Sequence, residues 1–304
     1  MSNEGKKLLL VGDNPFHRIS HLSQERGRVR SDAITHPEYA ANLVLTALEN
    51  GANGFMFSVN EMTLSILQLI HEMGGSKRPR LYPIVPYAFE YVRLVAQTGI
   101  QGLAKKFAKQ IAVSGNVRAI ATGLKGVIKT DPVALLKTYL TYEISRIKSS
   151  AGKQANLDSV LLHEVITDMA LALNLDWIFK AYVDFMLKLR IKPGFNTRNF
   201  AYLIKKLREW NIDFGQTAIA TPFNKVGFQM NPSRIECEKA LAETPEPSII
   251  AISILAAGYL KPLEAIGYIA NLPNIKGVAV GVSQEKHALE TFNLLKDGLG
   301  EFQN

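Results

Sequence analysis

The chain has 304 residues and is 47% hydrophobic, which is enough to bury one large core in a single domain spanning residues 1–304. Its one cysteine, Cys237, excludes an intramolecular disulfide framework and a multi-cysteine metal site, and it fits a reducing, cytoplasmic compartment. The net charge of +8 comes from lysines and arginines that are spread along the chain without interleaved aromatic residues, so we expect a small anionic substrate and no nucleic acid as partner.

The first apolar run of the chain, at residues 7–12, is too short for a signal peptide or a membrane span, and we interpret it as a strand. From there, short aliphatic runs alternate with amphipathic stretches whose apolar residues recur every three to four positions. In chain order we expect strand 7–12 and helix 37–51, strand 54–59 and helix 61–74, strand 81–86 and helix 131–147, strand 159–164 and helix 175–189, strand 192–196 and helix 197–211, strand 216–221 and helix 231–244, strand 248–255 and helix 262–272, and strand 277–282 and helix 284–298. Eight such pairs favour an α/β fold in which a parallel sheet closes on itself, the (β/α)8 or TIM barrel.

One segment, 97–130, interrupts this alternation between the third strand and its helix. We expect an insertion that is helical in part. It is either a lid over the barrel mouth or a helical excursion packed on the rim.

Barrels of this type carry their chemistry at the carboxyl ends of the strands, so the polar residues that follow each strand are the candidate site. The substrate-binding candidates are Asp13, Asn14, His17, Asn60, Glu61, Asn196, Arg198, Thr221 and Asn224. Tyr87, which follows the third strand, is a candidate catalytic residue.

His163 and Glu164 end an apolar strand, where an imidazole beside a carboxylate can act as acid and base. The alternative is a histidine satisfied within the core. Lys225 follows the sixth strand, where a desolvated lysine could form a Schiff base, and the alternative is a solvated loop charge.

Two further patterns suggest ligands. His17, His21 and Glu25 have the spacing of one helix face, but the arginines that follow would oppose a cation, so we expect no metal. Gly281, Val282 and Ser283 precede the last helix, with Ser283 as its cap, and backbone amides at such a start could bind a phosphate of substrate or cofactor. The alternative is that these residues only cap the helix.

The order of several fragments resembles the aldo-keto reductase superfamily over most of the chain. The fragments are LENGANGFMFSVNE (48–61), LDSVLLHE (157–164), IKPGFNTRNFAYLIKKL (191–207), FGQTAIATPFNKVG (214–227), ISILAAGYL (252–260) and KGVAVGVSQEKHALETF (276–292). The resemblance implies a TIM barrel and NADPH as cofactor, held in part by the loop at Gly281 and Ser283.

In that family an aspartate and a tyrosine after the second strand, a lysine after the third and a histidine after the fourth protonate a carbonyl during hydride transfer. Only His163 matches this pattern. The second strand offers Phe57, Ser58 and Asn60 instead, and the third offers Pro86 and Tyr87.

Two hypotheses follow. The first is an enzyme that acts on a small carbonyl or phosphorylated metabolite, either as a divergent reductase or as an aldolase-like lyase or isomerase that uses His163 and Glu164. The second is a noncatalytic barrel that binds a ligand without altering it.

Overall fold

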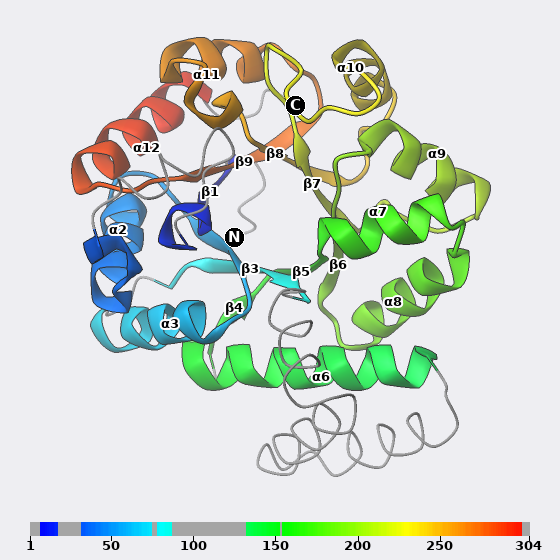
Figure 1. Cartoon of the computed structure of the whole chain (residues 1–304), viewed down its shortest axis with the longest axis horizontal. Coiled ribbons are helices and arrows are strands. Elements are labelled where there is room, and N and C mark those ends of the chain that lie inside the picture. Colours follow the sequence, from blue (N-terminus) through cyan, green and yellow to red (C-terminus); the bar gives the residue numbers. More distant parts are fainter. Residues whose placement is uncertain (1–6, 18–31, 75–77, 87–131, 153, 300–304) are drawn as a thin grey trace, which may run out of the picture.

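The computed structural model describes residues 7–17, 32–74, 78–86, 132–152 and 154–299 of the chain. Within these ranges, parallel strands close into a ring, and helices surround it as an outer layer (Figure 1). The strands of the ring are β1 (Leu8–Gly12), β2 (Gly54–Ser58), β3 (Arg80–Val85), β5 (Ser159–Leu162), β6 (Lys192–Asn196), β7 (Ala218–Pro222), β8 (Ser248–Ile252) and β9 (Ile275–Gly281). The ring closes because β2 pairs with β1 on one side and with β3 on the other. This confirms the predicted eight-stranded α/β barrel.

The helices mostly fall where the apolar periodicity predicted them. They are α2 (Pro37–Glu49), α3 (Glu61–Met73), α6 (Pro132–Ala151), α7 (Glu164–Ala172), α8 (Asp176–Lys188), α9 (Phe200–Glu209), α10 (Arg234–Ala242), α11 (Pro262–Ala270) and α12 (Glu285–Leu299). Three 3-10 turns, η1 (Asn14–His17), η2 (Asp32–Thr35) and η3 (Ala256–Gly258), and a short strand, β4 (Asn156–Leu157), which pairs with the start of β3, complete the described elements. None of the helices in the described ranges combines the length and apolar character needed to cross a membrane.

Side chains alternate between two cores along each strand. Leu8 and Leu10 of β1 belong to the cluster inside the ring, whereas Leu9 and Val11 belong to the larger cluster between the ring and the helices. The residues that continue the inward series at the carboxyl ends of the strands therefore face the mouth of the barrel.

Several boundaries differ from the prediction for local reasons. The strand predicted to reach residue 164 ends at Leu162, because His163 caps α7, a helix that the sequence analysis did not predict. The helix predicted from residue 231 begins at Arg234, where the Ser233 hydroxyl accepts a hydrogen bond from the backbone N–H of Glu236. The segment 97–130, the predicted insertion and candidate lid, lies outside the described residues.

Candidate functional site

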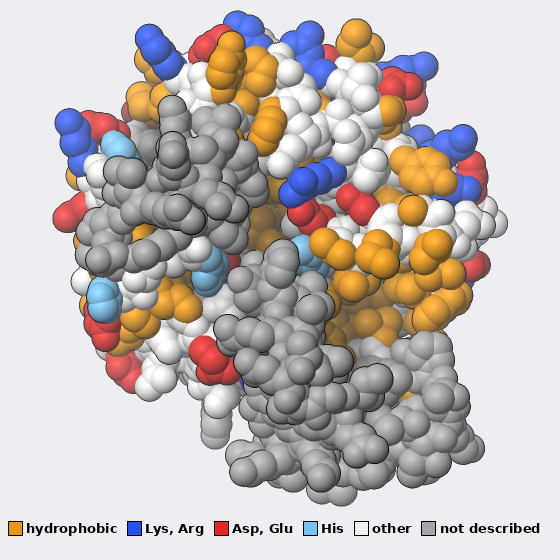
Figure 2. Space-filling model, viewed as in Figure 1, with side chains coloured by type: hydrophobic (Ala, Val, Ile, Leu, Met, Phe, Trp, Pro, Cys, Tyr) orange, Lys and Arg blue, Asp and Glu red, His pale blue; other side chains and the backbone are white. Residues whose placement is uncertain are grey.

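A cavity of about 350 Å³ opens at the carboxyl ends of the strands. Its polar lining residues are Asp13, Asn14, Ser58, His163, Glu164, Asn196, Arg198, Gln229 and Ser253, and Met56, Ile84 and Ile252 are among its apolar lining residues. Histidine, acidic and basic side chains meet near the centre of the face shown in Figure 2. The cavity is large enough for a small metabolite, and most of its lining comes from strand ends, as expected for a barrel site.

Asp13 follows β1 and is only 4% exposed. Its Oδ2 atom accepts a hydrogen bond from the backbone N–H of Ser58 at 2.7 Å and contacts Nε2 of His17 at 3.2 Å. The 3-10 turn η1 brings His17 back to Asp13, four residues earlier in the chain. The carboxylate is thus anchored through one oxygen, and no described residue donates a hydrogen bond to its Oδ1 atom.

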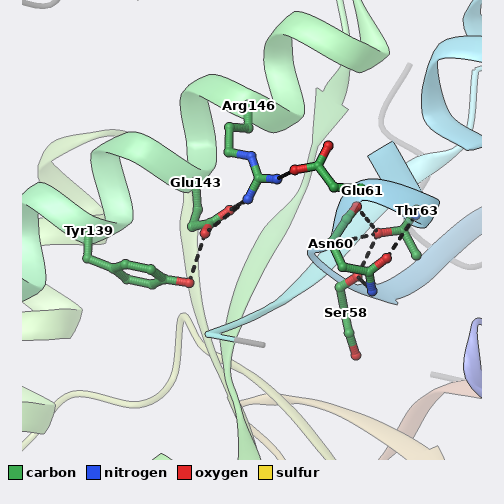
Figure 3. A network of polar contacts seen from close by, with 7 residues as sticks. All are labelled: Ser58, Asn60, Glu61, Thr63, Tyr139, Glu143 and Arg146. Atoms are coloured by element: carbon green, nitrogen blue, oxygen red, sulfur yellow. Dashed lines mark hydrogen bonds and ion pairs between the residues drawn. The ribbon is translucent and has the colours of Figure 1, made fainter. Parts of the chain in front are cut away.

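Asn60 supports this arrangement and is not among the described residues that line the cavity. Its Oδ1 atom accepts from the backbone N–H of Thr63 at 3.1 Å, and the Thr63 hydroxyl accepts from the backbone N–H of Asn60, so the two residues form a capping box at the start of α3 (Figure 3). Its Nδ2 atom lies 3.3 Å from Nε2 of His17. Asn60 and His17, both predicted to bind substrate, therefore hold Asp13 and the mouth in place.

Glu61 points toward Arg146 of α6 (Figure 3) and is not among the described residues that line the cavity. Its side chain is 77% exposed and pairs with Arg146 at 2.5 Å. Arg146 also pairs with Glu143, which is fully buried and accepts a hydrogen bond from the Tyr139 hydroxyl. Glu61 thus links α3 to α6, and its position gives no support to the predicted contact with substrate.

His163 lies at the N-cap of α7 and lines the cavity. Its Nδ1 atom accepts a hydrogen bond from the backbone N–H of Val165 at 3.1 Å, so a neutral ring carries its proton on Nε2. Burial lowers the pKa of His163 below its usual 6.5, with the negative charges of Glu164 and Asp13 opposing the shift. At neutral pH His163 is therefore an uncharged imidazole with an N–H donor.

Glu164 and Arg198 form a two-point ion pair at the cavity edge. Nε of Arg198 donates to Oε2 of Glu164 at 3.1 Å, and Nη2 donates to Oε1 at 2.5 Å. Asp168 accepts from the backbone N–H of Arg198, which fixes the loop after β6, and burial raises the pKa of this carboxyl group. Both carboxylate oxygens of Glu164 are occupied by the Arg198 guanidinium, and this argues against Glu164 as the acid–base partner of His163.

Asn196, the last residue of β6, is 7% exposed and lines the cavity. Its Oδ1 atom is buried and has no hydrogen-bond partner among the described residues. Because an unpaired buried acceptor costs free energy, this atom is suited to accept a hydrogen bond from a ligand.

Three other predicted residues lie apart from the cavity lining. Thr221 is buried on the outer side of β7. Asn224 closes its own loop through two hydrogen bonds with the backbone of Phe228. Lys225 is exposed and pairs with Glu264 of α11 at 2.7 Å, so it is a solvated charge and not a desolvated nucleophile.

Asn14 lines the cavity but is mostly exposed. Tyr87, His21 and Glu25 lie outside the described residues. The described residues contain no group of His, Cys, Asp and Glu side chains that could hold a metal ion.

The loop predicted to bind phosphate has a different local structure. Gly281 lines the cavity, and a Cβ atom there would lie 2.6 Å from Cδ of Pro15, so close packing against η1 explains the glycine. Val282 is buried, and α12 begins at Glu285, so Ser283 lies one residue before the cap position. Because Glu285 already places a carboxylate in the first turn, phosphate binding at this helix stays a prediction.

The loop after β8 contributes lining residues that the sequence analysis did not identify. Ser253 and Ala257 both line the cavity with φ in the left-handed region, at 53° and 61°. We expected the strand to run to residue 255, but the backbone turns at Ser253. The one sequence signal is Gly258, which also has a positive φ of 92° and adopts it at little cost because it has no Cβ atom.

The sequence matches no protein-family model and no curated protein. Solved structures of aldo-keto reductases are nevertheless similar in fold over nearly the whole chain. A Pseudomonas aeruginosa protein described as an aldo-keto reductase has a TM-score of 0.62 at 13% identity, covering 98% of this chain and 96% of that chain. The holo form of an aldo-keto reductase from Bacillus halodurans has a TM-score of 0.57 at 13% identity, covering 96% and 91%. An aldo-keto reductase from Klebsiella pneumoniae in complex with NADPH has a TM-score of 0.50 at 10% identity, covering 96% and 89%.

Proposed function

We propose that the chain is an oxidoreductase that reduces a small carbonyl compound with NADPH in the cavity at the barrel mouth. The observation that carries this proposal is His163, whose ring is uncharged near neutral pH and whose Nε2–H is left to donate because Nδ1 is used by the helix cap. The similarity in fold to aldo-keto reductases, one of them solved with NADPH, also supports the proposed reduction with NADPH.

The residues present fit the nicotinamide end of the cofactor. Asn196 offers an unpaired, buried carboxamide oxygen in the cavity lining, and the carboxamide NH2 group of nicotinamide is a donor that would satisfy it. The left-handed backbone at Ser253 and Ala257 also contributes to the cavity lining. The structure supports a binding site for the phosphates of the cofactor less well. In the loop from Gly281 to Ser283, the glycine packs against Pro15, and the helix that follows begins with the negatively charged Glu285.

In this proposal NADPH supplies a hydride to the carbonyl carbon when it is bound. The Nε2–H of His163 donates to the carbonyl oxygen, polarises it and stabilises the negative charge that develops there. A neutral imidazole is a good hydrogen-bond donor but a weak acid, so the alkoxide takes its proton from water in the open cavity.

The described part of the cavity lining contains no tyrosine that could serve as the positioned acid of the aldo-keto reductases. Phe57 is fully buried in the apolar cluster between the ring and the helices, and Ser58 and Asn60 have no phenol group. Tyr87 lies outside the described residues. Because a positioned general acid contributes about 10²- to 10⁴-fold, we expect turnover to be slow by a comparable factor.

The first experiment is a titration of the full chain with NADPH and NADH, followed by carbonyl-dependent NADPH oxidation with a panel of aldehydes and ketones. We expect NADPH to bind, and Asn196→Leu to weaken its binding about tenfold or more, because the nicotinamide carboxamide loses its acceptor. A matched control is Asn224→Leu, which alters a buried amide outside the cavity lining. Failure of both cofactors to bind would overturn the proposal, and binding without turnover of any carbonyl would favour the noncatalytic barrel.

A further inference from the structure

We propose that Asp13 determines the specificity of the cavity, favouring uncharged carbonyl compounds that carry a hydroxyl group and excluding phosphorylated or carboxylated ones. The inference rests on the proposed function in that it names the class of substrate for the same cavity. It also reverses the anionic substrate expected from the net charge of the chain.

The first argument is the hydrogen bonding of Asp13. An ionised carboxylate has two oxygen atoms that accept about four hydrogen bonds, and a buried one needs most of them satisfied. The Ser58 N–H and His17 both lie at Oδ2, and no described residue donates to Oδ1. Oδ1 is not among the buried polar atoms of the described residues that lack a partner, so it is accessible to water, and a ligand hydroxyl in the cavity can replace water as its donor whereas an anionic group cannot.

The second argument is the charge of the described lining. Arg198 is the cation among the described lining residues, and Glu164 binds its guanidinium at two points. His163 is uncharged near neutral pH. The described lining therefore carries two carboxylate groups, those of Asp13 and Glu164, and one guanidinium group. An anion in the cavity would be repelled by Asp13, and the repulsion is only weakly screened because the aspartate is 4% exposed.

The third argument is the placement of Asp13 in the ring. Asn196, at the end of β6, lies four strands from β1 in either direction around the ring. His163, after β5, lies between β6 and β3 in that order. If Asn196 held the nicotinamide of the cofactor, the side of the cavity near Asp13 would remain for the substrate. A hydroxycarbonyl compound can then place its carbonyl oxygen at His163 and its hydroxyl at Asp13.

The test compares dihydroxyacetone with dihydroxyacetone phosphate, two probes that differ by the phosphate group. Their affinities for the full chain are measured by ligand-observed NMR titration, without cofactor and with NADPH. We expect dihydroxyacetone to bind at least about tenfold more tightly than its phosphate, and Asp13→Asn to weaken dihydroxyacetone binding about tenfold, as expected for loss of a hydrogen bond to a charged group.

Glu164→Gln is the matched control, because it removes the same charge from the same lining. It weakens the hold on Arg198, so we expect it to strengthen binding of the phosphate, the probe that carries the negative charge. Equal or tighter binding of the phosphate by the unmodified chain, binding of neither probe, or unchanged dihydroxyacetone binding in a folded Asp13→Asn protein would each overturn the inference.

The two proposals fail separately in these measurements. If NADPH does not bind but dihydroxyacetone binds through Asp13, the proposed reduction is wrong and the role of Asp13 stands. If NADPH binds and carbonyls are reduced but phosphorylated substrates are preferred, the reduction stands and the role of Asp13 is wrong. Even if Asp13→Asn does not fold, the inferred specificity is tested by whether the unmodified chain binds dihydroxyacetone more tightly than dihydroxyacetone phosphate.

Discussion

At the scale of single residues, His163 combines two roles that two substitutions can separate. Its Nδ1 atom caps α7 through the Val165 N–H, and its Nε2–H is the proposed donor to a carbonyl oxygen. His163→Ser keeps an acceptor for the cap, whereas His163→Ala removes both groups. We expect only the alanine variant to lose about 1 kcal/mol of the free energy of unfolding, the usual cost of a lost N-cap.

Both variants should lose carbonyl-dependent NADPH oxidation by about 10²-fold or more, because each lacks the donor to the developing oxyanion. Urea unfolding gives the first quantity, and NADPH absorbance gives the second. If the serine variant kept full turnover, His163 would have no part in the reaction.

The buried imidazole also makes stability depend on pH. Burial holds the pKa of His163 in the folded chain below the 6.5 of an exposed histidine. Between these two values the unfolded chain binds a proton that the folded chain does not, so the free energy of unfolding rises with pH. The stabilisation is fully present above about pH 6.5 and is lost as the pH falls through the folded pKa.

His163→Ser lacks this titration. Its unfolding free energy should therefore fall less than that of the unmodified chain between about pH 7.5 and about pH 5.5, as measured by urea unfolding at each pH. Parallel pH profiles for the two proteins would contradict the lowered pKa.

Strand alternation explains which site residues could be predicted from the sequence. Ser58, Asn196 and Gly281 continue the inward series of their strands and line the cavity. Thr221 follows Ala220, which faces the inside of the ring, so the same alternation would have excluded it. A polar residue at a strand end is therefore more reliably predicted to line the cavity when the alternation also places it on the inward side of the strand.

The pairing of Glu164 with Arg198 could not be predicted in the same way. The two residues are 34 positions apart, and their contact depends on how α7 and the loop after β6 place two flexible side chains. The unpaired Oδ1 atom of Asn196 is likewise a property of the packed structure, because any donor nearby would have satisfied it.

At the scale of elements, Arg146 links α3 and α6 behind the mouth. It pairs with the exposed Glu61 and with the fully buried Glu143 (Figure 3). Arg146→Ala removes the guanidinium group that pairs with the fully buried Glu143 carboxylate, so we expect it to lower the free energy of unfolding by about 3 kcal/mol. Glu61→Gln should cost less than about 1 kcal/mol, because its partner contact is exposed to solvent.

A double variant tests the cause of the loss at Arg146. Glu143→Leu combined with Arg146→Met replaces the ion pair by apolar side chains and should recover most of the stability. Urea unfolding of the three proteins measures these differences. Equal losses for Arg146→Ala and Glu61→Gln would mean that the buried pair contributes nothing beyond the surface contact.

The elements themselves could be predicted to different degrees. Strand 192–196 was predicted with its observed bounds, because aliphatic residues and turn residues delimit it. The helix α7 was missed, because it is only nine residues long and its cap is a histidine, a residue that is not a usual helix start signal. The missed helix matters for function, since its cap orients the His163 ring.

At the scale of the whole molecule, two features allow the ring of strands to close. Side chains alternate between the inside and the outside of the ring, and glycines stand where neighbouring strands approach most closely. The sequence predicted the number of strands, but the pairing of first and last strands is a contact between segments more than 250 residues apart, such as Leu8 with Gly277. The alternation of apolar side chains excludes a shift of one residue in that register, but it does not distinguish registers that differ by two residues. The register is set by packing inside the ring, and a substitution at the seam can test it.

Gly277 lies at this seam between β9 and β1. A Cβ atom there would approach Cβ of Leu8 to 2.6 Å and its carbonyl oxygen to 2.8 Å, and both belong to a buried strand that cannot move aside easily. Gly277→Ala should therefore lower the free energy of unfolding by about 1–3 kcal/mol, the usual cost of overpacking a core.

Gly267→Ala is the matched control, because Gly267 lies on the exposed side of α11 and no atom lies within 4 Å of an added Cβ. That substitution should raise the free energy of unfolding by about 0.5–1 kcal/mol through helix propensity and a less flexible unfolded chain. Opposite shifts in urea unfolding for the same chemical change would locate the cost at the seam of the ring, and a neutral Gly277→Ala would mean that β1 and β9 are less tightly joined than their register indicates.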